Sequence, residues 1–361
     1  MPAQRIRIGV VGCGLIAQVM HLPYLAELSD RFEVVALCDV SEDVAAACAR
    51  RYGVDRVLGD WEELVSEPLD AVLVATSSDH APIAIAAAQA GRHVFVEKPM
   101  ALCSRDAEAV VAAAETARVC VQVGTHKRYD PAYERLAELL PAIGDLRLIR
   151  VTTLESPIAP HVAHYPLIAR DGSAEVVPKE RARAEEAAID VALGDVPEQT
   201  RQCYRTIVLH TLVHELNMLG GLLGEPSEIR SASLTQRCVG INMRYGDAEC
   251  HLSWVSLPGI ARYRQELAFY APTQRLTLTM PSPFLRNMPS RLTAEGGEVG
   301  TATSWERDEI VSFDEAFRRE LVEFADCISS GRAPRTPPTD GLRDVRLAEA
   351  IARADAAGRA R

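Results

Sequence analysis

A glycine-rich turn near the start of the chain has the clearest chemical signature. Residues 12–17 read Gly-Cys-Gly-Leu-Ile-Ala, a GxGxxA pattern between a β-branched run and a stretch with helical spacing. The first glycine permits a tight turn, the second lets backbone approach a pyrophosphate, and the small alanine lets the helix lie close to the strand. N–H groups at the helix start can then bind phosphates. The pattern predicts a dinucleotide-binding turn formed by Gly12, Gly14, Leu15 and Ile16.

An acidic residue, Asp39, ends the second expected strand and strengthens this interpretation. A carboxylate at that point binds ribose hydroxyls and repels a 2′-phosphate, so it predicts NAD in preference to NADP. Val40 follows and is counted among the cofactor contacts. The alternative is an ordinary glycine turn, with an Asp39 that only begins the next turn. The order of strand, glycine turn, helix and acid favours the nucleotide interpretation.

Histidine spacing suggests a second kind of chemistry. His210 and His214 are four residues apart and share one face of an expected helix, while His161 and His164 lie three residues apart upstream. Imidazoles at such spacings can bind zinc. The alternative is that His210 simply fills space on its helix.

The first third of the chain alternates strands and helices, which predicts βαβ units and a parallel sheet. Ligands of such sheets bind at the carboxyl ends of the strands. Thr76, Ser77, His80 and Lys98 all follow strands at that edge. The strands are expected at 5–11, 32–37, 71–75, 93–96 and 120–123, and the helices at 15–28, 44–51, 82–90 and 104–118.

Composition limits the remaining possibilities. A length of 361 residues suggests two domains, and a hydrophobic share of 48% with only 5% aromatics suggests an aliphatic core. The net charge of −11 disfavours nucleic acid as a partner. Nine cysteines without a CxxC pair indicate free thiols in a reducing compartment. With no signal peptide and no apolar stretch of about 18 residues, we expect a cytoplasmic protein without a membrane partner.

Three segments resemble the Gfo/Idh/MocA oxidoreductase family, and among its members the inositol dehydrogenases most closely. They are Ala-Gly-Arg-His-Val-Phe-Val-Glu-Lys-Pro-Met-Ala at 90–101, Val-Gln-Val-Gly-Thr-His-Lys-Arg-Tyr-Asp-Pro at 121–131, and Asp-Gly-Leu-Arg-Asp-Val at 340–345. The resemblance implies an α/β protein with an N-terminal Rossmann domain and a C-terminal α/β domain built on a large, mainly antiparallel, open-faced sheet. The β-rich runs 146–153, 231–239, 242–245, 248–255, 263–271 and 275–280 agree with that sheet.

The resemblance also implies domain limits. We expect a Rossmann domain at 1–124, a substrate and oligomerisation domain at 125–339, and a C-terminal helix at 340–361 that packs back on the Rossmann domain. An insertion at about 157–206 falls outside the resemblance, and its stretch 177–193 reads as a solvated helix. We expect the insertion to be a lid or an oligomer arm. Deleting Asp171–Glu198 should then raise KM for substrate and leave NAD affinity intact.

Residue roles follow from the resemblance as well. Lys98 would hold the substrate oxygen and relay its proton while hydride passes to the nicotinamide, and burial near a cationic ring would lower its pKa. The peptide bond that follows it is often cis in the family. His214 matches the family's acid/base histidine, but His210 and Asn217 replace two expected aspartates. The cofactor contacts include Thr76, Ser77, His80, Glu97 and Lys98, and the substrate contacts are His126, Lys127, His210 and His214.

These features predict an NAD-dependent dehydrogenase that acts on a secondary alcohol, or the matching ketone, of a cyclitol or sugar-like substrate. Because the nicotinamide takes the hydride, no catalytic metal is expected. The alternatives are a reductase of a non-sugar carbonyl or imine, suggested by the missing aspartate, and a non-catalytic NAD-binding regulator. Besides the small-molecule substrate, the expected partner is a second copy of the chain, in a dimer or tetramer formed through the C-terminal sheet.

Overall fold

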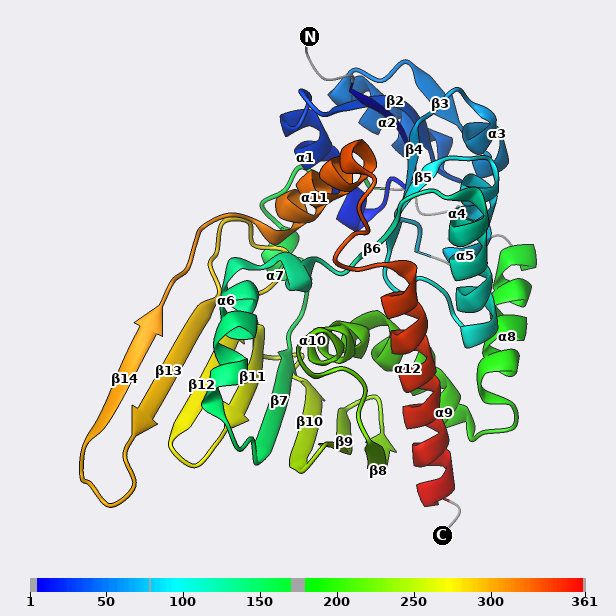
Figure 1. Cartoon of the computed structure of the whole chain (residues 1–361). Helices are drawn as coiled ribbons and strands as arrows, with labels where there is room; N and C mark the ends of the chain where they lie inside the picture. Colours follow the sequence, from blue (N-terminus) through cyan, green and yellow to red (C-terminus); the bar gives the residue numbers. More distant parts are fainter. Residues whose placement is uncertain (1–4, 78, 170–178, 360–361) are drawn as a thin grey trace. The chain divides into compact units, whose positions relative to one another are not determined.

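A computed structural model describes residues 5–77, 79–169 and 179–359 (Figure 1). The chain forms two compact units. Unit 1 comprises residues up to 125 together with 165–194 and 317–346, and unit 2 comprises 126–164, 195–316 and 347–361. The insertion at about 157–206 and the C-terminal helix at 340–361 therefore each contribute residues to both units.

Unit 1 contains a six-stranded, all-parallel sheet in the order β3-β2-β1-β4-β5-β6. This order reverses between β1 and β4, which is the arrangement of a Rossmann fold. The central strands are apolar runs buried on both faces, as a parallel sheet requires. The strands are β1 (Ile6–Val11), β2 (Phe32–Cys38), β3 (Arg56–Leu58), β4 (Ala71–Val74), β5 (His93–Glu97) and β6 (Val121–Gly124).

Helices flank this sheet at nearly the expected positions. The helix expected at 15–28 is present at 15–27, and it includes a π-helical turn, η1 (Ala17–His21), before α1 (Leu22–Glu27). The short elements β3 and α3 were not expected. The other helices between the strands are α2 (Glu42–Tyr52), α3 (Trp61–Ser66), α4 (Ala81–Gln89) and α5 (Ser104–Ala117).

Part of the insertion belongs to the core of unit 1. Helix α8 (Lys179–Leu193) contacts α5 and buries Ala188, Ile189, Ala192 and Leu193. The expectation of a solvated helix is therefore wrong for its C-terminal half. The segment 170–178, which includes the start of the deletion considered above, lies outside the described residues. A deletion of Asp171–Glu198 would also remove core residues of unit 1, so it cannot act on a lid alone.

Unit 2 contains an eight-stranded sheet in the order β14-β13-β12-β11-β7-β10-β9-β8. All neighbours are antiparallel except β7 and β10, which confirms the expected mainly antiparallel sheet. Burial alternates along β9, β10 and β12, so one face is covered more than the other. The strands are β7 (Leu148–Glu155), β8 (Glu228–Leu234), β9 (Cys238–Tyr245), β10 (Ala248–Ser256), β11 (Arg264–Tyr270), β12 (Gln274–Met280), β13 (Arg291–Gly297) and β14 (Ser304–Glu309).

The helical elements of unit 2 include one apolar run, Glu198–Leu223. By length and composition alone this run could cross a membrane, although the sequence analysis expected no such stretch. Its most apolar window is 61% buried inside the protein, and the core helix of a water-soluble protein passes the same test. The elements are η2 (His126–Tyr129), α6 (Pro131–Leu139), η3 (Leu140–Ile143), α7 (Ala159–Val162), α9 (Glu198–Cys203), the π-helix η4 (Tyr204–Leu212) and α10 (Val213–Leu223).

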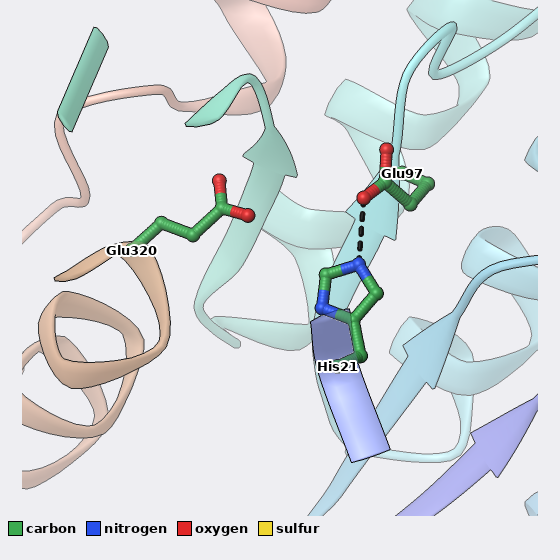
Figure 2. A group of neighbouring side chains, drawn as sticks. All are labelled: His21, Glu97 and Glu320. Carbon is green, nitrogen blue, oxygen red and sulfur yellow. Dashed lines mark hydrogen bonds and ion pairs between the residues drawn. The ribbon is translucent and has the colours of Figure 1, made fainter. Parts of the chain in front are cut away.

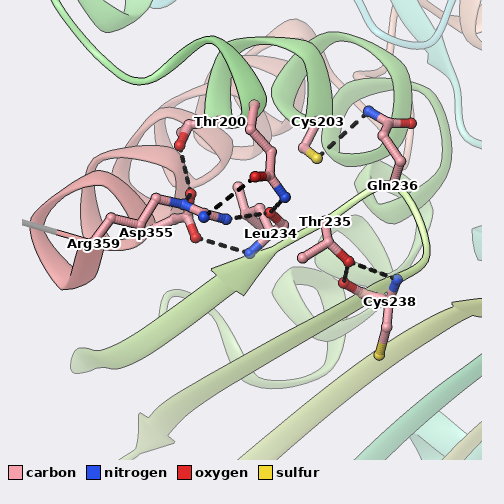
Figure 3. Close-up of polar contacts among 9 residues, drawn as sticks. Thr200, Cys203, Leu234, Thr235, Gln236, Cys238, Asp355 and Arg359 are labelled. Carbon is pink, nitrogen blue, oxygen red and sulfur yellow. Dashed lines mark hydrogen bonds and ion pairs between the residues drawn. The ribbon is translucent and has the colours of Figure 1, made fainter.

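The last two helices, α11 (Ala316–Ser330) and α12 (Pro338–Arg359), complete the units. Val345, in the first half of α12, is 1% exposed and belongs to the core of unit 1. The end of α12 is held in unit 2, where the buried Asp355 accepts hydrogen bonds from the Thr200 hydroxyl and the Leu234 N–H (Figure 3). Arg359 adds a bond to the Leu234 carbonyl at 2.6 Å. The C-terminal residues therefore hold α9 and β8 together.

Candidate active site

The expected cofactor residues lie together at the carboxyl edge of the sheet in unit 1. Gly12 has φ +99°, and a Cβ there would lie 2.5 Å from the Ala75 carbonyl oxygen, so only glycine fits. Gly14 is exposed, and a Cβ there would meet nothing within 4 Å. In this turn the backbone at Gly12 therefore lies close to that of Ala75, while the space next to Gly14 is open.

Asp39 binds the backbone of this turn. Its Oδ2 accepts the Cys13 N–H and its Oδ1 accepts the Ser41 N–H, both at 2.8 Å, and its side chain is nearly buried. Burial raises the pKa of the adjacent Cys38 thiol to about 12, the charge of Asp39 adds to this, and the charge of Arg181 on α8 opposes it. The Asp39 carboxylate is thus both a structural acceptor and a local negative charge.

Gln18 connects the glycine turn to the insertion. Its amide nitrogen donates to the Cys13 carbonyl at 2.8 Å and to the Ile168 carbonyl at 3.1 Å, and its amide oxygen accepts the Ile168 N–H at 2.8 Å. All three bonds lie within unit 1. The insertion therefore supports the turn that is expected to hold the cofactor, a role different from the lid or oligomer arm expected from the sequence.

Lys98 follows β5 at the same edge, half-buried, and its peptide bond to Pro99 is cis, as the resemblance implies. The preceding carboxylate, Glu97, accepts the Lys98 N–H at 3.1 Å. Gly124 leaves space for the Glu97 side chain, because a Cβ at residue 124 would lie 3.3 Å from the Glu97 carboxyl group. Thr76, Ser77 and the exposed Val40 also lie at this edge, after β4 and β2.

Glu97 belongs to a buried polar cluster with His21 and Glu320 (Figure 2). His21 Nε2 and Glu97 Oε1 are 2.6 Å apart, and the Glu320 carboxylate turns towards this pair. Burial raises the pKa of Glu97, but the hydrogen bond and charge of His21, followed by the charges of Lys98 and His80, outweigh burial and lower it overall. Because Glu97 is only 5% exposed, it supports Lys98 from inside the protein.

Among the described residues, His21, Glu97 and Glu320 form the group that could hold a metal ion. Each offers one ligand atom, and these three atoms lie within 4.8 Å of one another. The direct bond between His21 and Glu97 already uses two of these atoms. The rings of Phe95 and Phe317 lie edge-on to His21 at 5.4 and 5.8 Å. The histidines at 161, 164, 210 and 214, considered above as zinc ligands, form no such group within the described part of the chain.

The expected substrate residues lie in unit 2, and three of the four are buried. The rings of His126 and His214 meet edge-to-face with centroids 5.1 Å apart, so η2 and α10 bring these two residues together. Lys127 is 5% exposed. His210, at the end of the π-helix η4, is exposed, unlike His214 one turn later.

A network of buried polar side chains surrounds Lys127. Its ammonium donates to the Tyr263 hydroxyl at 3.0 Å and to the Gln265 amide oxygen. Gln265 in turn donates to Glu215, which also accepts a bond from Thr153. These partners are not among the residues expected from the sequence. The available signal was a glutamate directly after His214, in the helical run 210–219.

Burial and neighbouring acids raise the pKa of two acidic groups around this network. Burial, followed by the charge of Glu215, raises the pKa of Glu155 despite its hydrogen bond from Trp254. Burial and the same two carboxylates raise the pKa of Tyr263 well above its usual value. The Tyr263 hydroxyl is therefore a neutral donor and acceptor beside the Lys127 ammonium.

Comparison with known proteins agrees with the family resemblance. Residues 6–125 match the model of the oxidoreductase family GFO_IDH_MocA, described as having an NAD-binding Rossmann fold. Inositol 2-dehydrogenase of Salmonella paratyphi B is 28% identical over 226 residues, which are 61% of this chain and 55% of that relative. This chain thus matches about half the length of that relative. Inositol 2-dehydrogenase 3 of Saccharopolyspora erythraea is 27% identical over 341 residues, 93% of this chain and 89% of that one.

Solved structures share the fold over nearly the whole chain. KijD10, a 3-ketoreductase from Actinomadura kijaniata solved with NADP, superposes with a TM-score of 0.72 at 21% identity, covering 97% of this chain and 98% of that one. UDP-N-acetylglucosamine 3-dehydrogenase GnnA from Acidithiobacillus ferrooxidans gives 0.71 at 19% identity, covering 97% and 99%. Residues 6–125 thus match the Gfo/Idh/MocA oxidoreductase family model, the chain is similar in sequence to inositol dehydrogenases, and the solved structures share its fold.

Proposed function

We propose that the protein is a nicotinamide-dependent dehydrogenase that transfers hydride between its cofactor and a secondary alcohol, or the matching ketone, of a cyclitol or sugar-like substrate. The observation that carries this proposal is Lys98 at the carboxyl end of β5, on the same sheet edge as the glycine turn. An amine at this edge can reach a substrate that lies against a bound nicotinamide. The inositol dehydrogenase relatives support the substrate class.

The residues of unit 1 fit a dinucleotide. Gly12 and Gly14 form a turn that a Cβ would obstruct at the first position and that is open at the second. The backbone from Leu15 and Ile16 onward begins the helical segment and would bind the pyrophosphate. When bound, the cofactor would accept or supply the hydride. Asp39 and Val40 would face the adenine ribose, and Thr76 and Ser77 would line the cofactor.

NAD is the proposed cofactor because Asp39 is a nearly buried carboxylate at the end of β2. Its charge would oppose a 2′-phosphate and favour ribose hydroxyls. Arg181 is close enough to act on Cys38, so a positive charge also lies in this region. KijD10 was solved with NADP, and both cofactors therefore belong in the test.

The protein's own residues would manage the substrate proton. Lys98 would hold the substrate oxygen and pass its proton, while His214 would serve as acid/base or hydrogen-bond partner at that oxygen. His126 and Lys127 would bind other hydroxyls. His210 replaces a carboxylate of the family, so its imidazole would change which substrate is accepted.

The decisive experiment incubates the full chain with NAD or NADP and a panel of cyclitols and sugars while NADH or NADPH formation is followed by absorbance. We expect turnover with NAD and at least one cyclitol or sugar. Turnover of NADH only with non-sugar carbonyls or imines would favour the alternative reductase. Tight NADH binding without turnover of any class would favour a non-catalytic regulator and contradict the proposal.

The sheet of unit 2 is the proposed site of self-association. Strand β14 is exposed along most of its length, and Arg275–Glu295 and Arg291–Asp308 pair across neighbouring strands. Exposed faces of antiparallel sheets commonly pair in oligomers. Light scattering coupled to size exclusion should give a dimer or tetramer, and a monomer at micromolar concentration would contradict this part.

A further inference from the structure

His80 is a buried imidazole at the start of α4, and both of its ring nitrogens meet backbone carbonyl oxygens. Nδ1 lies 2.7 Å from the Pro99 oxygen, and Nε2 lies 2.8 Å from the Thr76 oxygen. The side chain is 3% exposed. The ring thus bridges the end of β4 and the turn that contains Lys98.

These two contacts determine the protonation of the ring. A carbonyl oxygen only accepts hydrogen bonds, and a neutral imidazole has a single N–H to donate. In either neutral tautomer, one nitrogen lone pair would face a carbonyl oxygen at hydrogen-bond distance. A flipped ring would present C–H groups to both oxygens and lose both bonds. Only the imidazolium, with two N–H donors, satisfies both contacts.

Charged groups around His80 are consistent with a cation. Burial raises the pKa of the adjacent, partly buried Asp79, while the hydrogen bond from the Ala81 N–H and then the charge of His80 oppose this rise. Asp106 and Glu185 act on Asp79 in turn, and Glu185 accepts the Asp79 N–H at 3.2 Å. On the other side, Glu97 also experiences the positive charges of His80 and Lys98. Glu97, whose pKa is lowered, is therefore the carboxylate that offsets this buried positive charge.

We propose that His80 is held as an imidazolium and is a positioning residue for Lys98, tying the Lys98–Pro99 turn to the end of β4 through Pro99 and Thr76. Because Glu97 accepts the Lys98 N–H, the turn is then fixed on both sides of the lysine. The positioning role rests on the proposed function, because it is tested by kinetics. The charge of the ring does not depend on that function. The positioning role also differs from the expected cofactor contact, since both nitrogens are already engaged by the protein.

The first test measures the ring charge without any assay of activity. The full chain, with its nine histidines labelled with ¹⁵N in the ring, is examined by NMR at the assay pH, and His80→Gln assigns the signal. We expect both nitrogens of His80 to be protonated. His93 is the internal reference, because its Nδ1 accepts the Cys120 N–H at 2.9 Å and must be unprotonated. A His80 signal with one unprotonated nitrogen would overturn the proposal.

The second test separates positioning from cofactor binding. Misplacement of a catalytic group by about 1 Å can cost on the order of 100-fold in rate. We expect His80→Ala to lower kcat by about 10- to 100-fold, with KM and the NADH Kd changed by less than about threefold, and His80→Gln to restore part of kcat. His93→Asn is the matched control and should leave kcat unchanged.

Two kinetic outcomes would overturn the positioning role. One is an unchanged kcat in His80→Ala. The other is a loss of NADH affinity as large as the loss of kcat, which would make His80 a cofactor ligand. If the protein turns over no substrate at all, the proposed function fails, but the NMR result still decides the charge of the ring. If His80→Ala does not fold, the wild-type NMR measurement remains decisive.

Discussion

The polar groups around the expected cofactor site and around the expected substrate residues are used differently. At the sheet edge of unit 1, side chains bind backbone groups: Asp39 accepts two N–H groups, Glu97 accepts that of Lys98, and His80 meets two carbonyls. Around Lys127 in unit 2, side chains bind one another, from Lys127 to Gln265 and from Gln265 to Glu215. The difference predicts that substitutions in the first region mainly change function and those in the second mainly change stability.

The largest expected effect tests whether residues at the sheet edge of unit 1 mainly affect activity. Lys98→Ala should lower kcat by about 10²- to 10⁴-fold, because it removes the proposed proton-transfer group. Since Lys98 is half-buried at the sheet edge, the midpoint of urea unfolding should change little. Steady-state kinetics and urea titration of the same sample measure both. Activity that survives the substitution would contradict the mechanism, and a large loss of stability would contradict the contrast.

The next largest effect concerns stability in unit 2. Glu215→Ala should lower the free energy of unfolding by about 2–4 kcal/mol, because it leaves the buried donors of Thr153 and Gln265 unsatisfied. Glu215→Gln keeps an acceptor oxygen and should cost less. The neighbouring Glu266→Ala is the control, since its ion pair with Arg264 is partly exposed and should contribute about 1 kcal/mol or less. If urea titrations gave Glu215→Ala and Glu266→Ala equal losses in the free energy of unfolding, the stabilising role of the buried network would be contradicted.

A smaller effect is expected at Asp39. Asp39→Asn should reduce the preference for NAD over NADP by about tenfold in kcat/KM, because the charge that opposes a 2′-phosphate is lost. Asp43→Asn, exposed on α2, should leave the ratio unchanged. The measurement is the ratio of initial rates with the two cofactors. A wild-type preference for NADP would show that Asp39 acts only as a backbone acceptor.

The smallest effect concerns pH. Burial lowers the pKa of His93 from its ordinary 6.5, so the folded protein favours the neutral ring. Its contribution to stability is therefore complete above pH 6.5 and is lost as pH falls below 6.5 towards the folded-state value. His93→Asn should flatten the acid side of the stability curve by less than about 1 kcal/mol. Thermal unfolding between pH 5 and 8 measures this, and an unchanged curve would exclude the coupling.

The sequence predicts unit 1 better than unit 2 for a physical reason. The glycine turn, Asp39 and the Lys98 segment are local motifs whose residues lie within a few positions of a strand end. The network around Glu215 instead depends on strand register, since Gln265 pairs with Thr153 across β11 and β7. Register between distant strands is not encoded in any short segment, so these partners could not be identified from one sequence.

Exposure explains the remaining misses. Strand β14 reads Ser-Trp-Glu-Arg-Asp-Glu and lacks the apolar alternation of a half-buried strand, because it lies at the sheet edge. Helix α8 reads as charged and Ala-rich, although its few apolar residues are enough to join a core. In both cases the deciding information is the neighbour against which the segment packs.

The division of unit 1 along the chain has a consequence for its synthesis. Its core combines Ile8 and Val10 of β1 with Phe317, Leu321 and Phe324 of α11. About 200 residues separate β6 from the end of this helical segment, so a ribosome adding about 5–20 residues per second needs about 10–40 s to supply them. During that interval the nascent nucleotide-binding half carries an apolar surface without its covering helix. Until α11 is synthesised, this exposed apolar surface is of the kind that favours aggregation and chaperone binding.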